Sequence, residues 1–438
     1  MLTVSKPVIC RDENKTMPPS PDEPPRSPLS RALWHFSPQW FLVPQGTGVL
    51  AIVLHQLHYQ FHGLRIIAKI VWIYTIAVLG ITLILYLLRC ILYPRHVGRE
   101  VRNNILETSC LSSISVTLTS IFEMIAMQYS DSASLAAYVL WWVTTGLAII
   151  FLLATPYVQL KLQPPGLARI PPAILLPVIA ALTSAAGGGG ICMAASAHLS
   201  HRLCVPAVIV SFFEIGVGMP LAIAFTAVVL LEHYKRKSAP DKVYQDLIIC
   251  GPFAQGGFAL MALGEVVLNG SFADYDRGMF LSSKAATPVG YFSVFTGVLS
   301  WGFGTFWWLF GLISVVHTLV SQKGGIKKTK FTMTVWSVVF PWVCFLFPFS
   351  LSHCSSLLPT MIVANDIGCV CKFGHRVRKT HGVSSVLRVV YSVGDPHGSD
   401  YCYCHSTHHQ RTDHWEGGGS GAWMADCAVG YERGCKPV

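Results

Sequence analysis

Apolar and polar positions alternate along this chain in long blocks. Nine mostly apolar segments are separated by short polar stretches, and they are centred on residues 39–57, 66–88, 107–128, 135–156, 170–196, 205–231, 245–268, 290–320 and 331–350. A helix of about 20 apolar residues is long enough to cross the roughly 30 Å hydrocarbon core of a bilayer. The pattern therefore predicts an all-α polytopic membrane protein.

Composition supports this prediction and sets the N-terminus apart. The 438 residues are 52% hydrophobic and only 12% charged, unlike an ordinary soluble domain. Residues 1–35 are instead rich in proline and charge ("TMPPSPDEPPRSPLSR"). We expect them to form a disordered cytoplasmic arm, without the apolar centre of a cleavable signal peptide.

The distribution of Lys and Arg predicts the orientation. With the N-terminus inside, the inner segments carry nineteen of these residues, and the outer loops carry only Arg65, Lys69, Arg202, Arg277 and Lys284. The net charge of +10 then reflects topology, and we expect no nucleic-acid partner. The sequon at Asn269 falls in an outer loop, where it is a candidate for glycosylation.

Glycine, proline and hydroxyl residues gather in the odd-numbered segments, as in "VPQGTG", "SCLSSISVTLTS", "LPVIAALTSAAGGGG" and "CGPFAQGG". Such residues are tolerated in membrane helices where protein or a water-filled cavity satisfies the freed backbone groups. We therefore expect the odd segments to line a polar path, with the even segments outside it. Tight packing of small residues without a pore is the alternative. The candidate pore-lining residues are Gly46, Thr47, Gly48, Ser113, Thr117, Thr183, Ser184 and Gln255.

Ionisable groups are few within the segments. None has a Lys or Arg near its centre, and the acids are Glu123, Glu214 and Glu265. Glu123 is a candidate for proton coupling, because an ionisable group at such depth often has a function. The alternative is a protonated or hydrogen-bonded structural acid. The chain shows no phosphate loop, nucleophile motif or carboxylate pair at a plausible site, so we expect neither an enzyme nor a cofactor.

Three motifs resemble those of a known family: "HFSPQWFLVPQGTGVLAIVL", "GPFAQGGFALMALGE" and "FTMTVWSVVFPW". They resemble the tellurite-resistance/dicarboxylate transporter (voltage-dependent anion channel) family, and within it the fungal plasma-membrane sulfite efflux pumps most closely. The family also includes yeast malate permeases and is related to slow anion channels of guard cells. The resemblance runs from about Phe36 to Trp342.

This resemblance implies ten helices in five hairpins, with kinked odd helices around a central pore, and a homotrimer. It also implies that a phenylalanine of the ninth helix occludes the pore, and the matching position is Phe340, followed by Pro341. We accordingly expect a multi-pass plasma-membrane transporter that exports sulfite. A malate or C4-dicarboxylate transporter or a slow anion channel is the alternative. A receptor or scaffold without a pore would show no anion flux.

The family pattern fails after Trp342, which divides the chain into 1–35, the transporter domain 36–342 and a tail, 343–438. The tail contains Cys402, Cys404, His405, His408 and His409, but their spacing matches zinc sites only loosely, and we assign no metal ligand.

The genetic code offers another interpretation of the tail. Val343-Cys344 can be encoded by GTATGT, a common fungal splice donor, and Ala364–Gly368 can encode a branch point and an acceptor. Permitted codons downstream, read one nucleotide on, supply an apolar tenth helix. We therefore hypothesise that the tail translates a retained intron followed by an out-of-frame exon.

Overall fold

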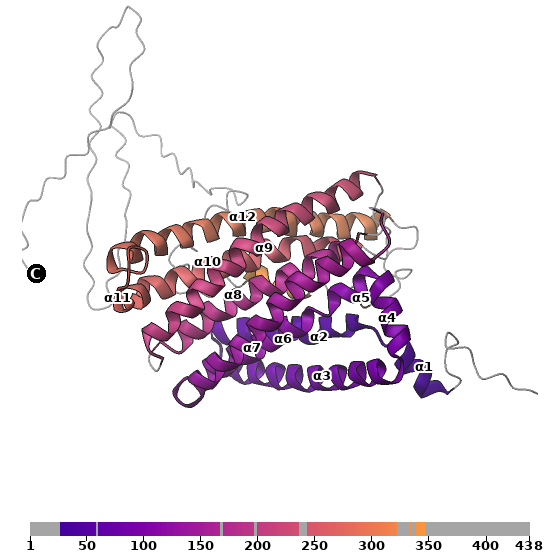
Figure 1. Cartoon of the computed structure of the whole chain (residues 1–438), viewed down its shortest axis with the longest axis horizontal. Coiled ribbons are helices and arrows are strands. Elements are labelled where there is room, and N and C mark those ends of the chain that lie inside the picture. The colour runs from indigo at the N-terminus through magenta and orange to yellow at the C-terminus, as the bar shows by residue number, and fades with distance from the viewer. Residues whose placement is uncertain are drawn as a thin grey trace, which may run out of the picture. The chain divides into compact units, whose positions relative to one another are not determined.

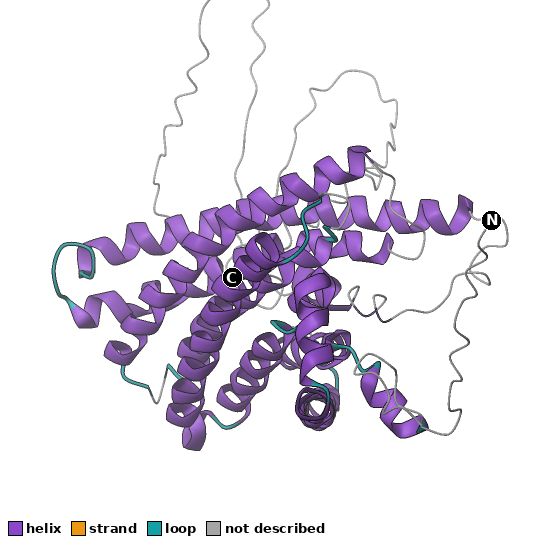
Figure 2. Cartoon of the chain, turned by 45° about the vertical axis from the view of Figure 1, so that its right-hand side comes forward, coloured by secondary structure: helices purple, strands orange, loops and turns teal. Residues whose placement is uncertain are grey.

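The computed structural model describes residues 27–57, 60–166, 170–196, 199–235, 243–321, 333, 336 and 339–346. All of them fall within the first of two units, Met1–Asp366. Apart from one isolated bridge between Arg277 and Leu281, the regular elements in these residues are helical (Figure 2). The hypotheses about a metal site, a retained intron and a tenth helix concern residues that lie outside the described part of the chain, except for residues 343–346.

The helices form an inner and an outer set. The inner set comprises η1 (Pro38–Phe41) with α2 (Leu42–Gln56), α5 (Ile105–Cys110) with α6 (Ser113–Gln128), η4 (Pro172–Leu175) with α8 (Leu176–Ala194), η5 (Val243–Ile249) with α10 (Cys250–Val266), and α13 (Val339–Leu346). The outer set comprises α3 (Leu64–Leu92), α7 (Ser130–Tyr157), α9 (His201–Lys235) and α12 (Ser283–Ser321). The remaining short elements are α1 (Pro28–Trp34), α4 (Pro94–Asn103), η2 (Val158–Leu162), η6 (Val267–Ser271) and α11 (Phe272–Tyr275).

The inner helices form a closed ring. Helix α2 packs against α6, α6 against α8, α8 against α10, α10 against α13, and α13 returns to α2. Each outer helix covers a junction of this ring: α3 covers α2 and α6, α7 covers α6 and α8, α9 covers α8 and α10, and α12 covers α10 and α13 (Figure 1). The expected assignment of odd segments to the inside and even segments to the outside therefore holds for the described helices.

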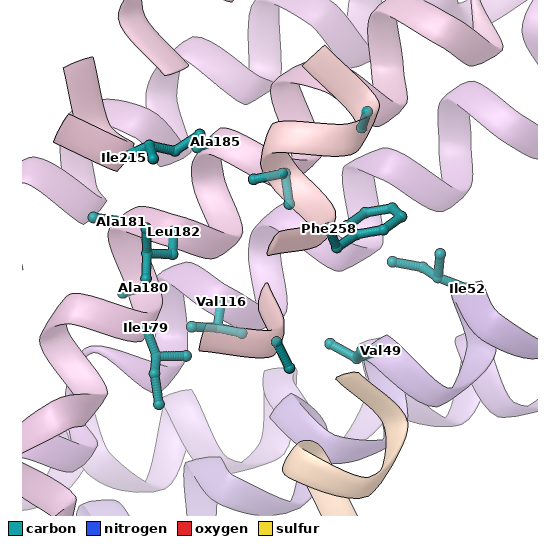
Figure 3. Packing of buried hydrophobic residues seen from close by; sticks show 14 of the residues in the cluster. Val49, Ile52, Val116, Ile179, Ala180, Ala181, Leu182, Ala185, Ile215 and Phe258 are labelled. Atoms are coloured by element: carbon teal, nitrogen blue, oxygen red, sulfur yellow. The ribbon is translucent and has the colours of Figure 1, made fainter. Parts of the chain in front are cut away.

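Burial separates the two sets. The most apolar stretches of the spans containing α8 and α10 are 100% buried, whereas those of α3 and α12 are only 28% buried. Side chains of the inner helices such as Val49, Val116, Ile179 and Phe258 meet in the core (Figure 3). The exposed faces of the outer helices are aliphatic and aromatic, which suits contact with lipid chains.

The glycine run of α8, Gly187–Gly190, explains how one helix can pack against four neighbours. Successive residues of a helix point about 100° apart. A Cβ added at Gly187 would collide with Thr119 of α6, and one at Gly188 would lie 2.5 Å from Ser211 Oγ of α9. At Gly189 it would lie 3.0 Å from Ala262 Cβ of α10, and at Gly190 it would collide with Glu123 of α6. Gly187 and Gly190 thus admit α6, Gly188 admits α9 and Trp141 of α7, and Gly189 admits α10.

Proline marks the start of four inner helices. Pro44, Pro177, Pro252 and Pro341 each fall within the first three residues of α2, α8, α10 and α13. Proline lacks the backbone N–H that a helix interior needs, but it is tolerated in the first turn. In the first three of these helices a 3₁₀ turn directly precedes the α-helix. The breaks expected in the inner helices therefore lie at one end of the ring.

Eight of the nine predicted segments are confirmed as helical, and the ninth is described only from residue 339 to 346, apart from residues 333 and 336. Seven described helices are long and apolar enough to cross a membrane. The first predicted segment, which forms η1 and the 15-residue helix α2, is not among those seven.

The expectation of disorder across residues 1–35 was wrong at its C-terminal end, where α1 forms. The Ser27 side chain caps this helix by accepting a hydrogen bond from the Ser30 N–H. Trp34 then stacks on His96, with 3.9 Å between the ring centroids, and meets Tyr93 edge-on. These aromatic contacts with α4 supply the apolar burial that we judged the arm to lack. Residues 1–26 lie outside the described part.

Candidate anion path

The inner helices run parallel, because residues at the starts of α2, α8 and α13 line one small cavity and residues at the ends of α8 and α10 line another. Helix α5, which precedes α6, contacts the turns η1 and η4 at the first of these ends. The N-terminal ends of α2, α6, α8, α10 and α13 therefore face the same side of the ring. Each helix N-terminus carries a partial positive charge of about half an elementary charge. Their convergence creates a mouth that favours anions without any Lys or Arg at the centre of the path.

Phe340 closes the ring near this mouth. Its side chain is only 4% exposed. It borders a cavity of about 10 Å³, which is little more than the space for one water molecule. The cavity is lined by Leu42, Gln45, Leu176, Ile179, Ile248, Trp336 and Phe340. Residues of four inner segments therefore meet around the phenyl ring in the described structure.

Two glycines bring α13 close to its neighbours. A Cβ added at Gly46 of α2 would lie 3.1 Å from Val339 Cγ1. A Cβ at Gly251 of α10 would lie 3.9 Å from Phe340 Cε1 and 3.0 Å from Ile179 Cδ1. Larger side chains at these glycines would push against α13, so they help to set the position of the phenyl ring.

Several buried polar atoms on the inner helices lack partners. Among the described residues, no hydrogen-bond partner is found for Gln45 Oε1, Ser113 Oγ, Glu123 Oε1 and Gln255 Oε1, and all four side chains are at most 3% exposed. An unsatisfied polar group in a membrane protein costs several kcal/mol (about 2–7 kcal/mol for a buried amide or hydroxyl). Such groups are tolerated where water or a polar ligand can visit them.

Not every candidate lining residue faces the interior of the ring. Thr47 accepts a 2.8 Å hydrogen bond from the hydroxyl of Thr75 on α3. Ser184 shares a 2.8 Å hydrogen bond with Thr145 on α7. At Gly48 an added Cβ would lie 2.5 Å from Ser120 Oγ on α6. The hydroxyls of Thr47 and Ser184 and the close approach at Gly48 therefore belong to contacts between helices.

The other candidates are buried within the inner set. Thr117 and Thr183 each donate a 2.8 Å hydrogen bond to a backbone carbonyl four residues earlier in the same helix. Ser113 and Gln255 carry the unpartnered oxygen atoms already described, and Gly46 faces α13. Asn269 is apart from these residues, exposed in η6 just beyond α10.

Glu123 lies on α6, 3% exposed, in the space that the missing side chain of Gly190 leaves on α8. Glu214, also 3% exposed, lies on the outer helix α9. The two acids are therefore carried by an inner and an outer helix respectively, and Glu123 is the one that belongs to the ring.

Sequence reasoning missed a set of polar links at the N-terminal end of the ring. Glu107 of α5 forms a buried salt bridge of 3.2 Å with Arg89 at the end of α3. Asp246 of η5 pairs at 2.9 Å with His233 at the end of α9, and it accepts a 3.2 Å hydrogen bond from Ser314 of α12. The sequence did contain a signal for these links. Acids lie at the starts of inner segments and basic residues at the ends of outer ones, and both placements complement helix dipoles.

A known protein family matches most of this chain. A family model described as the voltage-dependent anion channel matches residues 35–349. The chain belongs to the voltage-dependent anion channel family. The family resemblance inferred from the three motifs is thereby confirmed, and the matched range contains the whole described ring and outer set.

The individual proteins that are similar to this chain differ in the substrates that their names give. The chain is 28% identical over 315 residues to a sulfite efflux pump of Arthroderma otae, covering 71% of this chain and 80% of that protein. It is 21% identical over 384 residues to a malic acid transport protein of Schizosaccharomyces pombe, covering 86% and 82%. An uncharacterised transporter of Methanocaldococcus jannaschii is 24% identical over 313 residues, covering 70% and 82%. The family is thus one of anion transporters, and the fold accommodates more than one anion.

Proposed function

We propose that this protein exports sulfite across the plasma membrane, with its N-terminus in the cytoplasm. The observation that carries this proposal is the 28% identity to a sulfite efflux pump over the transporter domain, against 21% to a malic acid transport protein. Malate or another C4-dicarboxylate is the second candidate, favoured by the longer alignment with the malic acid transport protein.

In this proposal the anion enters at the end where the inner helices begin. Helix N-termini attract it, and the amide N–H groups of Gln45 and Gln255 and the hydroxyl of Ser113 donate hydrogen bonds that replace part of its water shell. The phenyl ring of Phe340 blocks the path by its size and by excluding water, and transport requires it to move aside. No step of this mechanism needs a fixed positive side chain.

Glu123 is proposed to couple transport to protons, because its carboxyl group is buried in the ring and Oε1 has no partner in the described structure. A Glu123→Gln variant keeps the size of the side chain but cannot release a proton. We expect it to retain anion binding and to lose stimulation of flux by a proton gradient. Equal stimulation of the variant and the parent would remove Glu123 from the mechanism.

Substrate choice is tested by reconstituting the protein into liposomes and measuring uptake of radiolabelled sulfite and malate side by side. Preference for sulfite, and weak competition by unlabelled malate, are the expected results. Malate flux at or above that of sulfite would favour the second candidate. Absence of flux for both anions would point to a receptor or scaffold.

We further propose that Asn269 carries a glycan, since it is exposed at the end of α10 that the proposed orientation places outside. A mobility shift after glycosidase treatment, lost in Asn269→Gln, is expected. Absence of the shift in protein from the plasma membrane would count against this orientation. A homotrimer is also proposed, and its test is the mass of the purified protein with detergent subtracted.

The retained-intron hypothesis stays a proposal for residues 343–438. If it holds, a spliced transcript encodes a chain with a complete ninth helix and a tenth one. Sequencing of the mature transcripts tests it directly. Messages that all keep the segment intact would refute it, and equal sulfite export by the two forms would show that the tenth helix is dispensable.

A further inference from the structure

Two cysteines meet at the end of the ring opposite to Phe340. Cys192 belongs to the last turn of α8, and Cys204 to the first turn of α9, the helix that follows it in the chain. Each side chain is only 2% exposed. Because α8 and α9 form a hairpin, the short connection between them brings the two residues to the same level.

The two thiols are neighbours at this end of the ring. Both also line one small cavity, of about 10 Å³, together with Met193, Ser196, Val266, Asn269 and Ser271. Such a volume admits about one water molecule, so the residues around it are close neighbours. Because Asn269 is exposed, this cavity lies next to the protein surface.

The surroundings hold this pair in place. The hydroxyl of Tyr138 on α7 donates a 2.8 Å hydrogen bond to the carbonyl of Leu203, the residue before Cys204. The start of α9 is thereby tied to α7 as well as to α8. Two thiols on adjacent helix ends that border one small cavity are suitably placed for a disulfide, which requires Cα atoms within about 7 Å of each other.

We propose that Cys192 and Cys204 form a disulfide that joins the outer end of the inner helix α8 to the outer helix α9. The oxidant is a low-molecular-weight disulfide such as oxidised glutathione. One cysteine thiolate attacks it, forming a mixed disulfide and releasing one glutathione thiol. The second cysteine then attacks the mixed disulfide, which releases the second glutathione thiol and leaves the protein disulfide.

In cells this step rests on the proposed orientation, which places these helix ends on the oxidising outer side. Cys110 and Cys250 provide a built-in control. Both are buried, and they lie at the opposite end of the ring, at the end of α5 and the start of α10. The Cys250 thiol donates to the carbonyl of Leu247 at 3.2 Å. Neither is part of a contacting thiol pair in the described structure, so both are expected to stay reduced.

The experiment uses the purified full-length protein in detergent, equilibrated with oxidised glutathione. The protein is denatured in an alkylating reagent, before or after reduction, and its peptides are analysed by mass spectrometry. We expect a cross-linked peptide joining Cys192 to Cys204, with the mass of two hydrogen atoms missing. Alkylation of these two residues should rise at least about tenfold after reduction, while alkylation of Cys110 and Cys250 stays unchanged.

Full alkylation of Cys192 and Cys204 without reduction would overturn the proposal, and so would mixed disulfides with glutathione on both. The cross-link is measured in the parent protein, so the test does not depend on a variant that might misfold. A Cys204→Ser variant should abolish the cross-link and leave a free thiol at Cys192. The glycan at Asn269 reports orientation separately: a glycan with free thiols contradicts the disulfide alone.

Discussion

Helices α8 and α12 are both apolar enough to cross a membrane, yet the protein uses them in opposite ways. The most apolar stretch of α8 is buried throughout and carries four consecutive glycines, which together admit the neighbouring helices α6, α7, α9 and α10. Helix α12 is mostly exposed and presents Phe292, Phe295 and Ile313 outwards. Apolar composition thus marks both as membrane helices, but the positions of small residues decide which of them belongs to the ring.

Polar groups do not follow this division. Buried atoms without partners in the described structure lie on inner helices, such as Ser113 Oγ and Gln255 Oε1, and also on the outer helix α9, such as Ser211 Oγ. Where the two sets meet, a paired example is the bridge between Arg89 and Glu107. Unpartnered polar atoms alone therefore do not distinguish the ring, whereas the buried bridge joins the two sets.

The largest expected effect comes from breaking the bridge between the sets. Arg89→Met would leave Glu107 buried without its partner, which typically costs about 3–5 kcal/mol. We expect a large drop in the melting temperature of the detergent-solubilised protein, followed by size-exclusion fluorescence. The double variant Arg89→Met/Glu107→Met should recover part of this loss. A single variant as stable as the parent would show that the bridge is not needed to join α3 to α5.

A smaller effect should separate two glycines of α12. A Cβ at Gly297 would lie 2.7 Å from the carbonyl oxygen of Gly257 on α10, whereas a Cβ at Gly302 would meet nothing within 4 Å. We expect Gly297→Ala to destabilise the protein by about 1–3 kcal/mol. Gly302→Ala should be neutral or stabilising by up to about 1 kcal/mol, because alanine favours helix. Equal melting temperatures of the two variants would contradict the close contact between α10 and α12.

The smallest effect concerns α1 and pH. Burial and the charge of Arg89 lower the pKa of His96, which stacks on Trp34. The stability of this contact is therefore fully present above the ordinary pKa of about 6.5 and declines as the pH falls towards the lower folded value. The emission of Trp34, obtained by subtracting the Trp34→Phe spectrum, should shift to longer wavelength on acidification. In His96→Gln the shift should disappear; its persistence would assign it to another group.

The sequence was sufficient for the order of the helices and for the division into two sets, because each signal was repeated along the chain. Spans of about 20 apolar residues and the regular placement of breakers do not depend on any single contact. The direction of individual side chains could not be obtained in this way. Thr47 and Ser184 share the sequence character of lining residues, but their hydroxyls pair with Thr75 and Thr145 on outer helices.

Contacts between distant segments were equally hidden. The link between Arg89 and Glu107 required knowing that the end of α3 returns to the start of α5, which the number of basic residues in the inner segments does not show. The helix at residues 28–34 escaped notice because its stability comes from Trp34 packing against α4 and not from its own composition. In both cases tertiary packing outweighs the local pattern.

The central claim, that five inner helices enclose an anion path closed by Phe340, is tested most directly by anion flux through liposomes containing Phe340→Ala. Removing the phenyl ring of Phe340 should open the path and raise sulfite flux at least about tenfold over the parent protein. Trp342→Ala is the matched control: its side chain is 39% exposed and packs on Trp308 of α12, so its flux should stay near that of the parent. Unchanged flux in a correctly folded Phe340→Ala protein, or an equal rise in both variants, would contradict the account.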